Sequence, residues 1–221
     1  MRIGVFGGSF NPIHYGHLLL ADEISERLTV DTLIFVPASR PPHKPERELA
    51  PARDREAMVR LAIADHPVFS VSTIELDREG LSYSVETVEA LSSGFGEDAR
   101  LFFLIGGETF LDLPSWKEPD RLARNCTLTV VPRHGSPFDP ESPAARKVLA
   151  LLGKRRWNVL PQEGPPPPVG DEEVLLVRAT SLPISASELR RRAREERSLR
   201  YRVPPAVAAY ITAHGLYRAH P

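Results

Sequence analysis

The sequence predicts an α/β protein built on one parallel, doubly wound sheet. Short apolar runs, which are typical of buried strands, alternate along the chain with segments in which apolar residues recur at helical spacing. The links between these segments are short, so each strand would be followed by a helix that returns the chain to the sheet. Glycine, histidine and arginine residues follow several of the strands, at the edge where open α/β sheets bind ligands.

Composition limits the class of protein. With 221 residues, 42% of them hydrophobic and 26% charged, the chain is expected to form a single globular domain, residues 1–221. The net charge of −1 argues against a broad nucleic-acid surface. No apolar run approaches the roughly 18 residues of a membrane span, and the sequence enters a strand directly instead of a signal peptide. The lone cysteine, Cys126, can form no internal disulfide, so a cytoplasmic location is expected.

The first strand and the first helix enclose a turn rich in glycine and histidine. A strand is expected at residues 3–6 and a helix from near Tyr15, and between them lies the run Gly7-Gly8-Ser9-Phe10-Asn11-Pro12-Ile13-His14-Tyr15-Gly16-His17. Gly7 and Gly8 let backbone N–H groups approach a ligand, and the start of a helix favours negative charge. The turn therefore predicts a phosphate site.

His14 and His17 are spaced so that both side chains would face the crevice beyond the strand. Gly16 between them leaves room for a bulky group, and two imidazoles suit the charge that develops on a phosphate during transfer. Two alternatives remain, namely a cap histidine beside a packed one, and a metal-binding pair. The metal is disfavoured because no nearby histidine or carboxylate completes a set of ligands.

Two familiar nucleotide loops are excluded. The turn has no Gly-Lys-Ser/Thr, so it is not a Walker-type phosphate loop. Gly4, Gly7 and Gly8 do not fit G-x-G-x-x-G, and the second strand ends at residues 36–38 without the acid that binds a ribose. A bound NAD cofactor of the dehydrogenase kind is therefore not expected.

The later strands are predicted from continuous apolar runs. Residues 32–36 form such a run, as expected in a parallel sheet covered on both faces. Further strands are expected at 68–71, 101–105, 127–132 and 173–177. Residues 153–173 are expected to form an irregular surface excursion around the polyproline segment 165–168.

Helical spacing predicts a helix over residues 52–64. Met58 and Leu61 are expected on its buried face, with Arg53 and Arg55 at the surface. Two further helices, one opening at Ser185 and one over 204–214, make residues 183–221 a C-terminal helical part.

A second candidate phosphate site lies at the first of these late helices, in Ile184-Ser185-Ala186-Ser187-Glu188-Leu189-Arg190. Ser185 with Glu188 three positions on is a capping box that opens a helix. The N–H groups of that helix start, the two serine hydroxyls, and Arg190 on the next turn would together bind a polyphosphate.

Four further residues that follow strands suit a nucleotide ligand. Lys44 lies in a basic, proline-rich loop and has the charge for a phosphate, with a solvated lysine as the alternative. Ser84 suits a carboxylate at a helix start, or serves as an N-cap. Trp116 offers a face for stacking on a flat ring, or packs on the core. Arg133, after the fifth strand, has a guanidinium shaped for a phosphate.

These motifs resemble those of a known family. The first turn resembles the H-x-G-H signature of the nucleotidyltransferase superfamily, and the late helix start is similar to its I-S-S/A-T/S-x-I/L-R signature. Further matches narrow the resemblance to the bacterial nicotinate-nucleotide adenylyltransferases: Pro41-Pro42-His43-Lys44, Tyr83-Ser84, Trp116, Arg133 and Gly215-Leu216-Tyr217-Arg218. The resemblance extends from residue 3 to residue 218 and implies the Rossmann-like nucleotidyltransferase fold.

The resemblance implies a role for each site residue. His14, His17 and Arg190 would be catalytic. Contacts to ATP or its phosphates would come from Gly7, Gly8, Ser9, Phe10, Gly16, Lys44, Gly106, Glu108, Ile184, Ser185 and Ser187. The pyridine nucleotide would be held by Tyr83, Ser84, Trp116, Lys117 and Arg133. Glu108 stands where the family usually has Asp, so its carboxylate is one methylene further from the backbone.

The implied reaction is transfer of the adenylyl group of ATP to nicotinate mononucleotide, which gives nicotinate adenine dinucleotide and pyrophosphate in NAD biosynthesis. The attacking phosphate is already an anion, so no general base is needed. Mg²⁺ would be carried on the ATP phosphates, and no protein metal site is expected. Two rivals stay open: a transferase of the same fold that acts on nicotinamide mononucleotide or phosphopantetheine, and a non-catalytic nucleotide-binding module. Neither nucleic acid nor a membrane is an expected partner, and homo-oligomer formation is left open.

Overall fold

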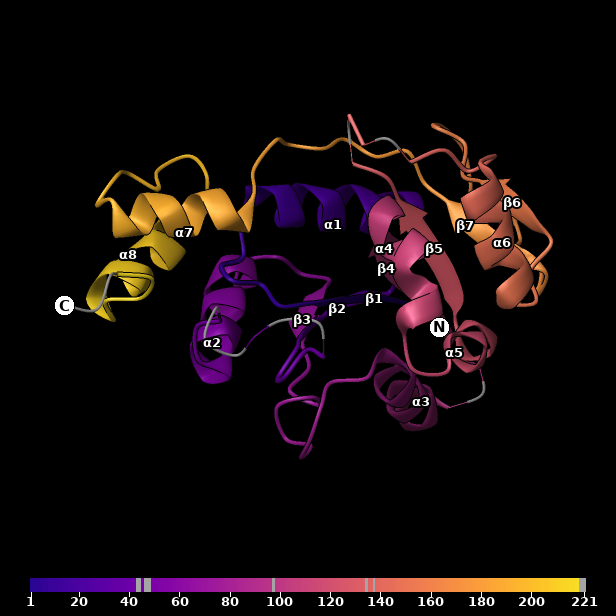
Figure 1. The fold of residues 1–221 in the computed structure, drawn as a ribbon, viewed down its shortest axis with the longest axis horizontal. Helices are drawn as coiled ribbons and strands as arrows, with labels where there is room; N and C mark the ends of the chain where they lie inside the picture. The colour runs from indigo at the N-terminus through magenta and orange to yellow at the C-terminus, as the bar shows by residue number, and fades with distance from the viewer. Residues whose placement is uncertain (43–44, 46–48, 97, 134, 137, 219–221) are drawn as a thin grey trace.

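A seven-stranded parallel sheet organises the chain (Figure 1). The computed structural model describes residues 1–42, 45, 49–96, 98–133, 135–136 and 138–218. The sheet has the order β3-β2-β1-β4-β5-β7-β6, and every neighbouring pair of strands is parallel. The strands are β1 (Arg2–Gly8), β2 (Thr32–Pro37), β3 (Phe69–Val71), β4 (Arg100–Gly106), β5 (Thr127–Val131), β6 (Arg156–Val159) and β7 (Glu173–Leu176). The predicted α/β class and parallel sheet are confirmed.

Helices cover both faces of this sheet. They are α1 (Tyr15–Arg27), α2 (Ala52–Ile63), α3 (Ser84–Phe95), α4 (Gly107–Asp112), the 3₁₀ turn η2 (Leu113–Ser115), α5 (Pro119–Asn125), α6 (Pro143–Leu151), α7 (Ala186–Arg194) and α8 (Pro205–Ala213). One hydrophobic cluster contains residues of α1, α2, α7 and α8, and a second contains residues of α3, α4, α5 and α6. Figure 1 shows α1 on one side of the sheet and α3 and α5 on the other.

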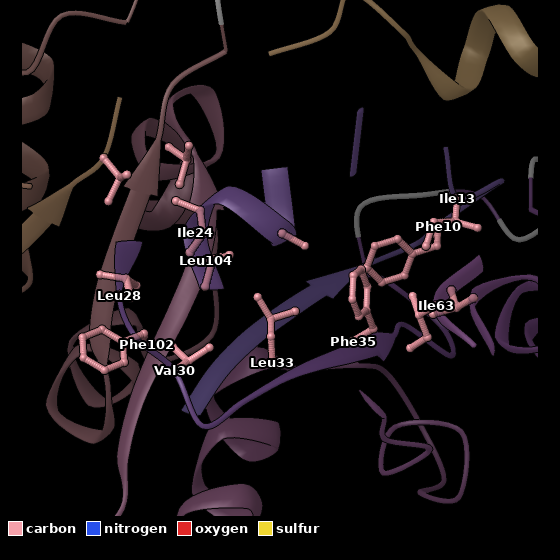
Figure 2. Packing of buried hydrophobic residues seen from close by; sticks show 14 of the residues in the cluster. Phe10, Ile13, Ile24, Leu28, Val30, Leu33, Phe35, Ile63, Phe102 and Leu104 are labelled. Carbon is pink, nitrogen blue, oxygen red and sulfur yellow. The ribbon is translucent and has the colours of Figure 1, made fainter. Parts of the chain in front are cut away.

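Strand β2 shows how a continuous apolar run supplies both clusters. Successive side chains of a strand point to opposite faces of the sheet. Leu33 and Phe35 accordingly belong to the α1 side, while Ile34 and Val36 belong to the α3 side. Figure 2 shows Phe35 packed beside Phe10 from the turn after β1, with ring centroids 5.6 Å apart. The core therefore extends beneath the first candidate phosphate turn.

The order of the strands fixes the position of the site. From β1 the chain moves outward through β2 to β3, and then returns to place β4 on the other side of β1. The direction of winding thus reverses between β1 and β4. In open α/β sheets the crevice beyond the carboxyl ends of the strands at this reversal is the ligand site. The turn after β1 and the Gly106-Gly107 segment after β4 border it.

Two expectations about α2 are wrong. Arg55, expected at the surface, is only 1% exposed, whereas Leu61, expected in the core, is 41% exposed. Arg55 lies three and four residues before the buried Met58 and Val59 and so shares their face of the helix. Its guanidinium is accommodated there because four backbone carbonyls accept its N–H groups.

The expectation of an irregular excursion at residues 153–173 is also partly wrong. Residues Arg156–Val159 form the edge strand β6, which pairs in parallel with β7. β6 alternates apolar and polar residues and is only partly buried, because only one of its edges is paired. Helices α5 and α6 were likewise not anticipated from the sequence.

Replacement of Phe35 by alanine is expected to destabilise the fold by about 3–5 kcal/mol, because a fully buried ring packed on Phe6, Phe10 and Phe69 would leave a cavity. Phe95→Ala is the matched control, since Phe95 is 40% exposed and should change stability by less than about 1 kcal/mol. Urea unfolding of both variants measures the difference. Equal losses would contradict the assigned core.

Candidate active site

The turn between β1 and α1 has a tightly constrained backbone. Phe10 has a φ of 43°, and the Asn11–Pro12 peptide bond is cis. A Cβ atom on Gly8 would lie 3.2 Å from the Phe10 ring, and one on Gly16 would lie 3.0 Å from His14 Nδ1. A side chain at either position would therefore press on the neighbouring ring, which glycine avoids.

The two histidines of the turn lie against each other. Their rings are stacked, with centroids 3.7 Å apart and an interplanar angle of 24°. The backbone N–H of His14, the N-cap residue of α1, donates to His17 Nδ1 at 3.3 Å. Because Nδ1 accepts this bond, we assign the proton of neutral His17 to Nε2. The edges of Phe6 and Phe10 contact His17, with centroids 6.0 and 5.3 Å away, and fix the orientation of its ring.

Electrostatics keep His14 neutral. Burial, together with the positive charge of Arg133, lowers its pKa from 6.5 to about 4. At neutral pH the imidazole is therefore uncharged, so it is suited to hydrogen bonds and not to an ion pair. An anion bound beside it would offset both effects and favour the protonated form.

The late helix start lies against the early turn. Arg190 on α7 donates from Nη1 to the Asn11 carbonyl at 2.9 Å and from Nη2 to Ser187 Oγ at 3.3 Å. The Tyr15 N–H, at the start of α1, donates to the Arg202 carbonyl at 3.0 Å. The N-terminal ends of α1 and α7 thus lie close together, although 170 residues separate Tyr15 and Ser185 in the chain (Figure 1).

Of the two hydrogen bonds in the predicted capping box of α7, the structure shows the one from the helix backbone to the serine side chain. Ser185 Oγ accepts from the Glu188 N–H at 3.2 Å. The Glu188 carboxylate pairs with Arg191 at 2.6 Å. Ile184, just before the cap, packs its side chain against the core, so its backbone is the part that can face a ligand.

Two charged residues, Glu108 and Arg133, follow β4 and β5. Glu108, in the first turn of α4, accepts a hydrogen bond from Ser136 Oγ at 2.7 Å. This bond, with a further contribution from the nearby Arg133, lowers the pKa of the Glu108 carboxyl. A cavity of about 270 Å³ opens beside Arg133 and is also lined by Phe138 and Arg178. The carboxyl ends of β5 and β7 therefore border a hollow with both a carboxylate and guanidinium groups near it.

The candidate pyridine residues lie around the start of α3. Tyr83 is its N-cap residue and Ser84 its first residue. Lys117 lies over the Tyr83 ring, with Nζ 4.5 Å from the centroid, and its ammonium pairs with Glu86 at 2.7 Å. The pair with Glu86 raises the pKa of Lys117. Trp116 is half-buried against the core on the same side of the sheet.

Lys44 and Phe10 complete the set of residues predicted to contact ATP. Lys44 lies outside the described residues. Phe10 is 3% exposed and packs on Phe6, Phe35 and His17, so its side chain belongs to the core and only its backbone can face a ligand.

Sequence reasoning missed two buried polar residues that shape the turn. Arg55 donates to the Ser9 carbonyl at 2.8 Å. Asn11 Oδ1 accepts from the Ala50 N–H at 3.0 Å and from the Tyr217 hydroxyl at 2.9 Å. The helical spacing of Arg55 with Met58 and Val59 was the available signal for the first residue. No pattern in the sequence marks the contacts of Asn11.

Fold and site together define a class of protein, a Rossmann-like nucleotidyltransferase. A family model described as cytidylyltransferase-like matches residues 5–192. A probable nicotinate-nucleotide adenylyltransferase of Thermus thermophilus is 44% identical over 218 residues, which cover 99% of this chain and all of the relative. One of Thermomicrobium roseum is 38% identical, with 98% of this chain and 92% of the relative covered. The chain belongs to the cytidylyltransferase-like family and, within it, to the nicotinate-nucleotide adenylyltransferases.

A solved structure extends this likeness to the fold. The nicotinic acid mononucleotide adenylyltransferase of Plasmodium falciparum, complexed with NaAD, superposes with a TM-score of 0.69 at 18% identity. The match covers 98% of this chain and 97% of the other. Within the described part of the chain, no helix has the length and apolar character to cross a bilayer. Those same residues contain no cluster of three or more histidine, cysteine or acidic side chains suited to a metal ion.

The lowered pKa of His14 predicts that the fold weakens in acid. Between pH 6.5 and about 4 the unfolded chain binds a proton at His14 that the folded chain does not, so stability falls as the pH falls. The expected loss is about 1.4 kcal/mol per pH unit in that window. Urea unfolding in buffers without phosphate measures this slope.

His14→Gln should lose this part of the pH dependence, because glutamine does not titrate. His214→Gln, at an exposed histidine, is the control and should keep the slope of the original protein. If His14→Gln keeps the full slope, the protein does not hold His14 neutral.

Proposed function

We propose that this protein catalyses adenylyl transfer from ATP to nicotinate mononucleotide, with nicotinate adenine dinucleotide and pyrophosphate as products. The observation that carries the proposal is the contact of Arg190 with the carbonyl of Asn11, which joins the two helix starts that we expect to bind phosphate. Curated relatives that carry this activity in their names match nearly the whole chain at up to 44% identity. We place the reaction in the cytoplasm, since a single cysteine suits a reducing compartment.

The reaction requires alignment of two phosphates more than acid–base catalysis. A phosphate oxygen of the mononucleotide attacks the α-phosphorus of ATP, a new P–O bond forms, and the bond to the leaving pyrophosphate breaks. The nucleophile is an anion at neutral pH, so the protein need not remove a proton. Its task is to hold both groups in line and to stabilise the charge that spreads between them.

The early turn would bind the α-phosphate. The proton assigned to His17 Nε2 gives this residue a hydrogen-bond donor, and the neutral His14 lies stacked on it at 3.7 Å. Backbone N–H groups of Gly7, Gly8 and Ser9 would add donors that need no reorganisation. Donors fixed in this way stabilise charge more effectively in a partly buried site than they would in water.

The start of α7 would bind the leaving pyrophosphate. Arg190 supplies a guanidinium, and the Ser185 and Ser187 hydroxyls lie at the same helix end. The helix dipole adds partial positive charge at this position. Mg²⁺ would arrive on the ATP phosphates, where it neutralises part of their negative charge.

The acceptor would lie beside the start of α3. Tyr83 and Ser84 present the N–H groups of a helix start, which suit the carboxylate of a nicotinate ring. Trp116 would stack on the ring, and Lys117 and Arg133 would supply positive charge. Glu108 and the cavity beside Arg133 would receive the adenosine part of ATP.

Purified protein with ATP and Mg²⁺ is expected to release pyrophosphate when nicotinate mononucleotide is added. Nicotinamide mononucleotide and phosphopantetheine, assayed in parallel, should give much slower release, because the proposed acceptor site favours a carboxylate. Stoichiometric nicotinate adenine dinucleotide identifies the product. Faster release with either of the other acceptors would assign the chain another substrate, and no release with any would leave a nucleotide-binding module.

His17→Ala is expected to lower kcat by on the order of 100-fold, because a preorganised donor to the transition state is lost. The fold should persist, since His17 is only partly buried. His214→Ala removes an exposed imidazole elsewhere and should leave kcat unchanged. Ordinary turnover by a folded His17→Ala protein would remove His17 from the catalytic set.

A further inference from the structure

Arg55 is a buried cation that the proposed reaction does not use. Its side chain is 1% exposed, and none of the carboxylates that the structure describes forms an ion pair with it. Its N–H groups instead go to backbone carbonyls of Ala50 at 2.9 Å, Ser9 at 2.8 Å, Ala38 at 2.6 Å and Ser39 at 3.1 Å. Burial lowers its pKa, so the charge is costly to place there.

These carbonyls belong to two different loops at the ligand edge of the sheet. Ser9 lies in the turn after β1, and Ala38 and Ser39 directly follow β2. In a trans peptide the C=O and the next N–H point in opposite directions. A Ser9 carbonyl held by Arg55 therefore turns the Phe10 N–H away from Arg55, and the same holds for the N–H groups of Ser39 and Arg40.

Ser82 binds those last two N–H groups from the other side. Its hydroxyl oxygen accepts from Ser39 N at 3.0 Å and from Arg40 N at 3.1 Å, and its own N–H donates to the Arg40 carbonyl at 3.0 Å. The segment after β2 is thus held between Arg55 and Ser82. Ser82 directly precedes Tyr83 and Ser84, the candidate pyridine-binding pair.

Glu75 anchors Ser82 in turn. This carboxyl is 7% exposed and is hydrogen-bonded by Ser82 and by Thr87 Oγ1, the latter at 2.7 Å. Thr87 lies in the first turn of α3. A continuous set of hydrogen bonds therefore runs from the turn after β1 through Arg55, residues 38–40, Ser82 and Glu75 to the start of α3.

We infer that Arg55, Ser82 and Glu75 are positioning residues that fix the phosphate turn relative to the acceptor site. We call these three residues the buried network. The phosphate of the mononucleotide must come within bonding distance of the α-phosphorus in line, and the network joins the turn that would bind the α-phosphate to the segment that would hold the pyridine ring. A misplacement of about 1 Å costs on the order of 100-fold in rate. The changes in kcat and KM that we expect rest on the proposed function.

Arg55→Lys tests the Arg55 end of the network. Lysine keeps the charge, but its single ammonium cannot bind carbonyls at the positions of a planar fork. We expect kcat to fall about 10- to 100-fold, with KM for the acceptor changed much less, because the phosphate turn is loosened. Arg53→Lys is the matched control in the same helix, since the Arg53 side chain is 65% exposed and should leave kcat unchanged.

Ser82→Ala tests the acceptor end. Loss of the hydroxyl frees the N–H groups of Ser39 and Arg40 and removes a partner of Glu75. We expect KM for the acceptor to rise about tenfold, as for one lost hydrogen-bonding group, with a smaller change in kcat. Ser70→Ala, which removes an exposed hydroxyl on β3, is the control.

Hydrogen exchange provides a readout that does not depend on activity. In Arg55→Lys, amides of residues 7–10 and 38–40 should exchange at least several-fold faster, while those of α6, on the other face of the sheet, keep their rate. Faster exchange throughout the protein would show that Arg55 only stabilises the fold, which would overturn the inference. Unchanged exchange together with unchanged kcat and KM would overturn it as well. If the original protein shows no transfer to any acceptor, the proposed function fails, and the exchange result still decides the role of the network.

Discussion

The site depends on one hydrogen bond, from the Arg190 guanidinium to the Asn11 carbonyl, between residues 179 positions apart. Two helix N-termini and several guanidinium groups converge where it forms, and like charges brought together repel. The Asn11 carbonyl supplies partial negative charge that offsets part of this repulsion. A bound triphosphate would supply far more. The arrangement therefore favours an anionic ligand, which would compensate for the positive charge gathered there.

Neutral polar groups beneath the site hold these charges in place. Asn11 Oδ1 accepts from the Tyr217 hydroxyl, and burial raises the pKa of that tyrosine, so it remains a neutral donor. Tyr217 has a φ of 66°, and follows Gly215, at 60°, in the segment that ends α8. The C-terminal segment thus contributes a fixed contact to the turn after β1. It shapes the candidate active site as well as covering one face of the sheet.

Much of the fold could be predicted from the sequence, because the residue patterns that specify these strands and helix starts are local. A strand buried on both faces must be continuously apolar, so β1, β2, β4 and β5 were predictable. The turn before α1 and the start of α7 were predictable, as places where a helix begins, from glycine and cap chemistry. The edge strand β6 was not, since one unpaired edge leaves it half-polar. The helical spacing of Arg55 indicated the buried face of α2, but the carbonyls that accept from its guanidinium lie in two distant loops, which no local pattern records.

The different charge states of histidine and arginine in the candidate site follow from burial and from the nearby positive charges. His14 is buried and lies close to Arg133, so it cannot readily hold a proton, and its pKa is lowered to about 4. A guanidinium under the same conditions stays charged, because its ordinary pKa is so much higher. Positive charge in the site must therefore come from arginine, while the histidines supply directional hydrogen bonds. In the protein without ligand His14 adds no positive charge, whereas a phosphate bound beside it would favour the protonated imidazole and so add a hydrogen-bond donor there.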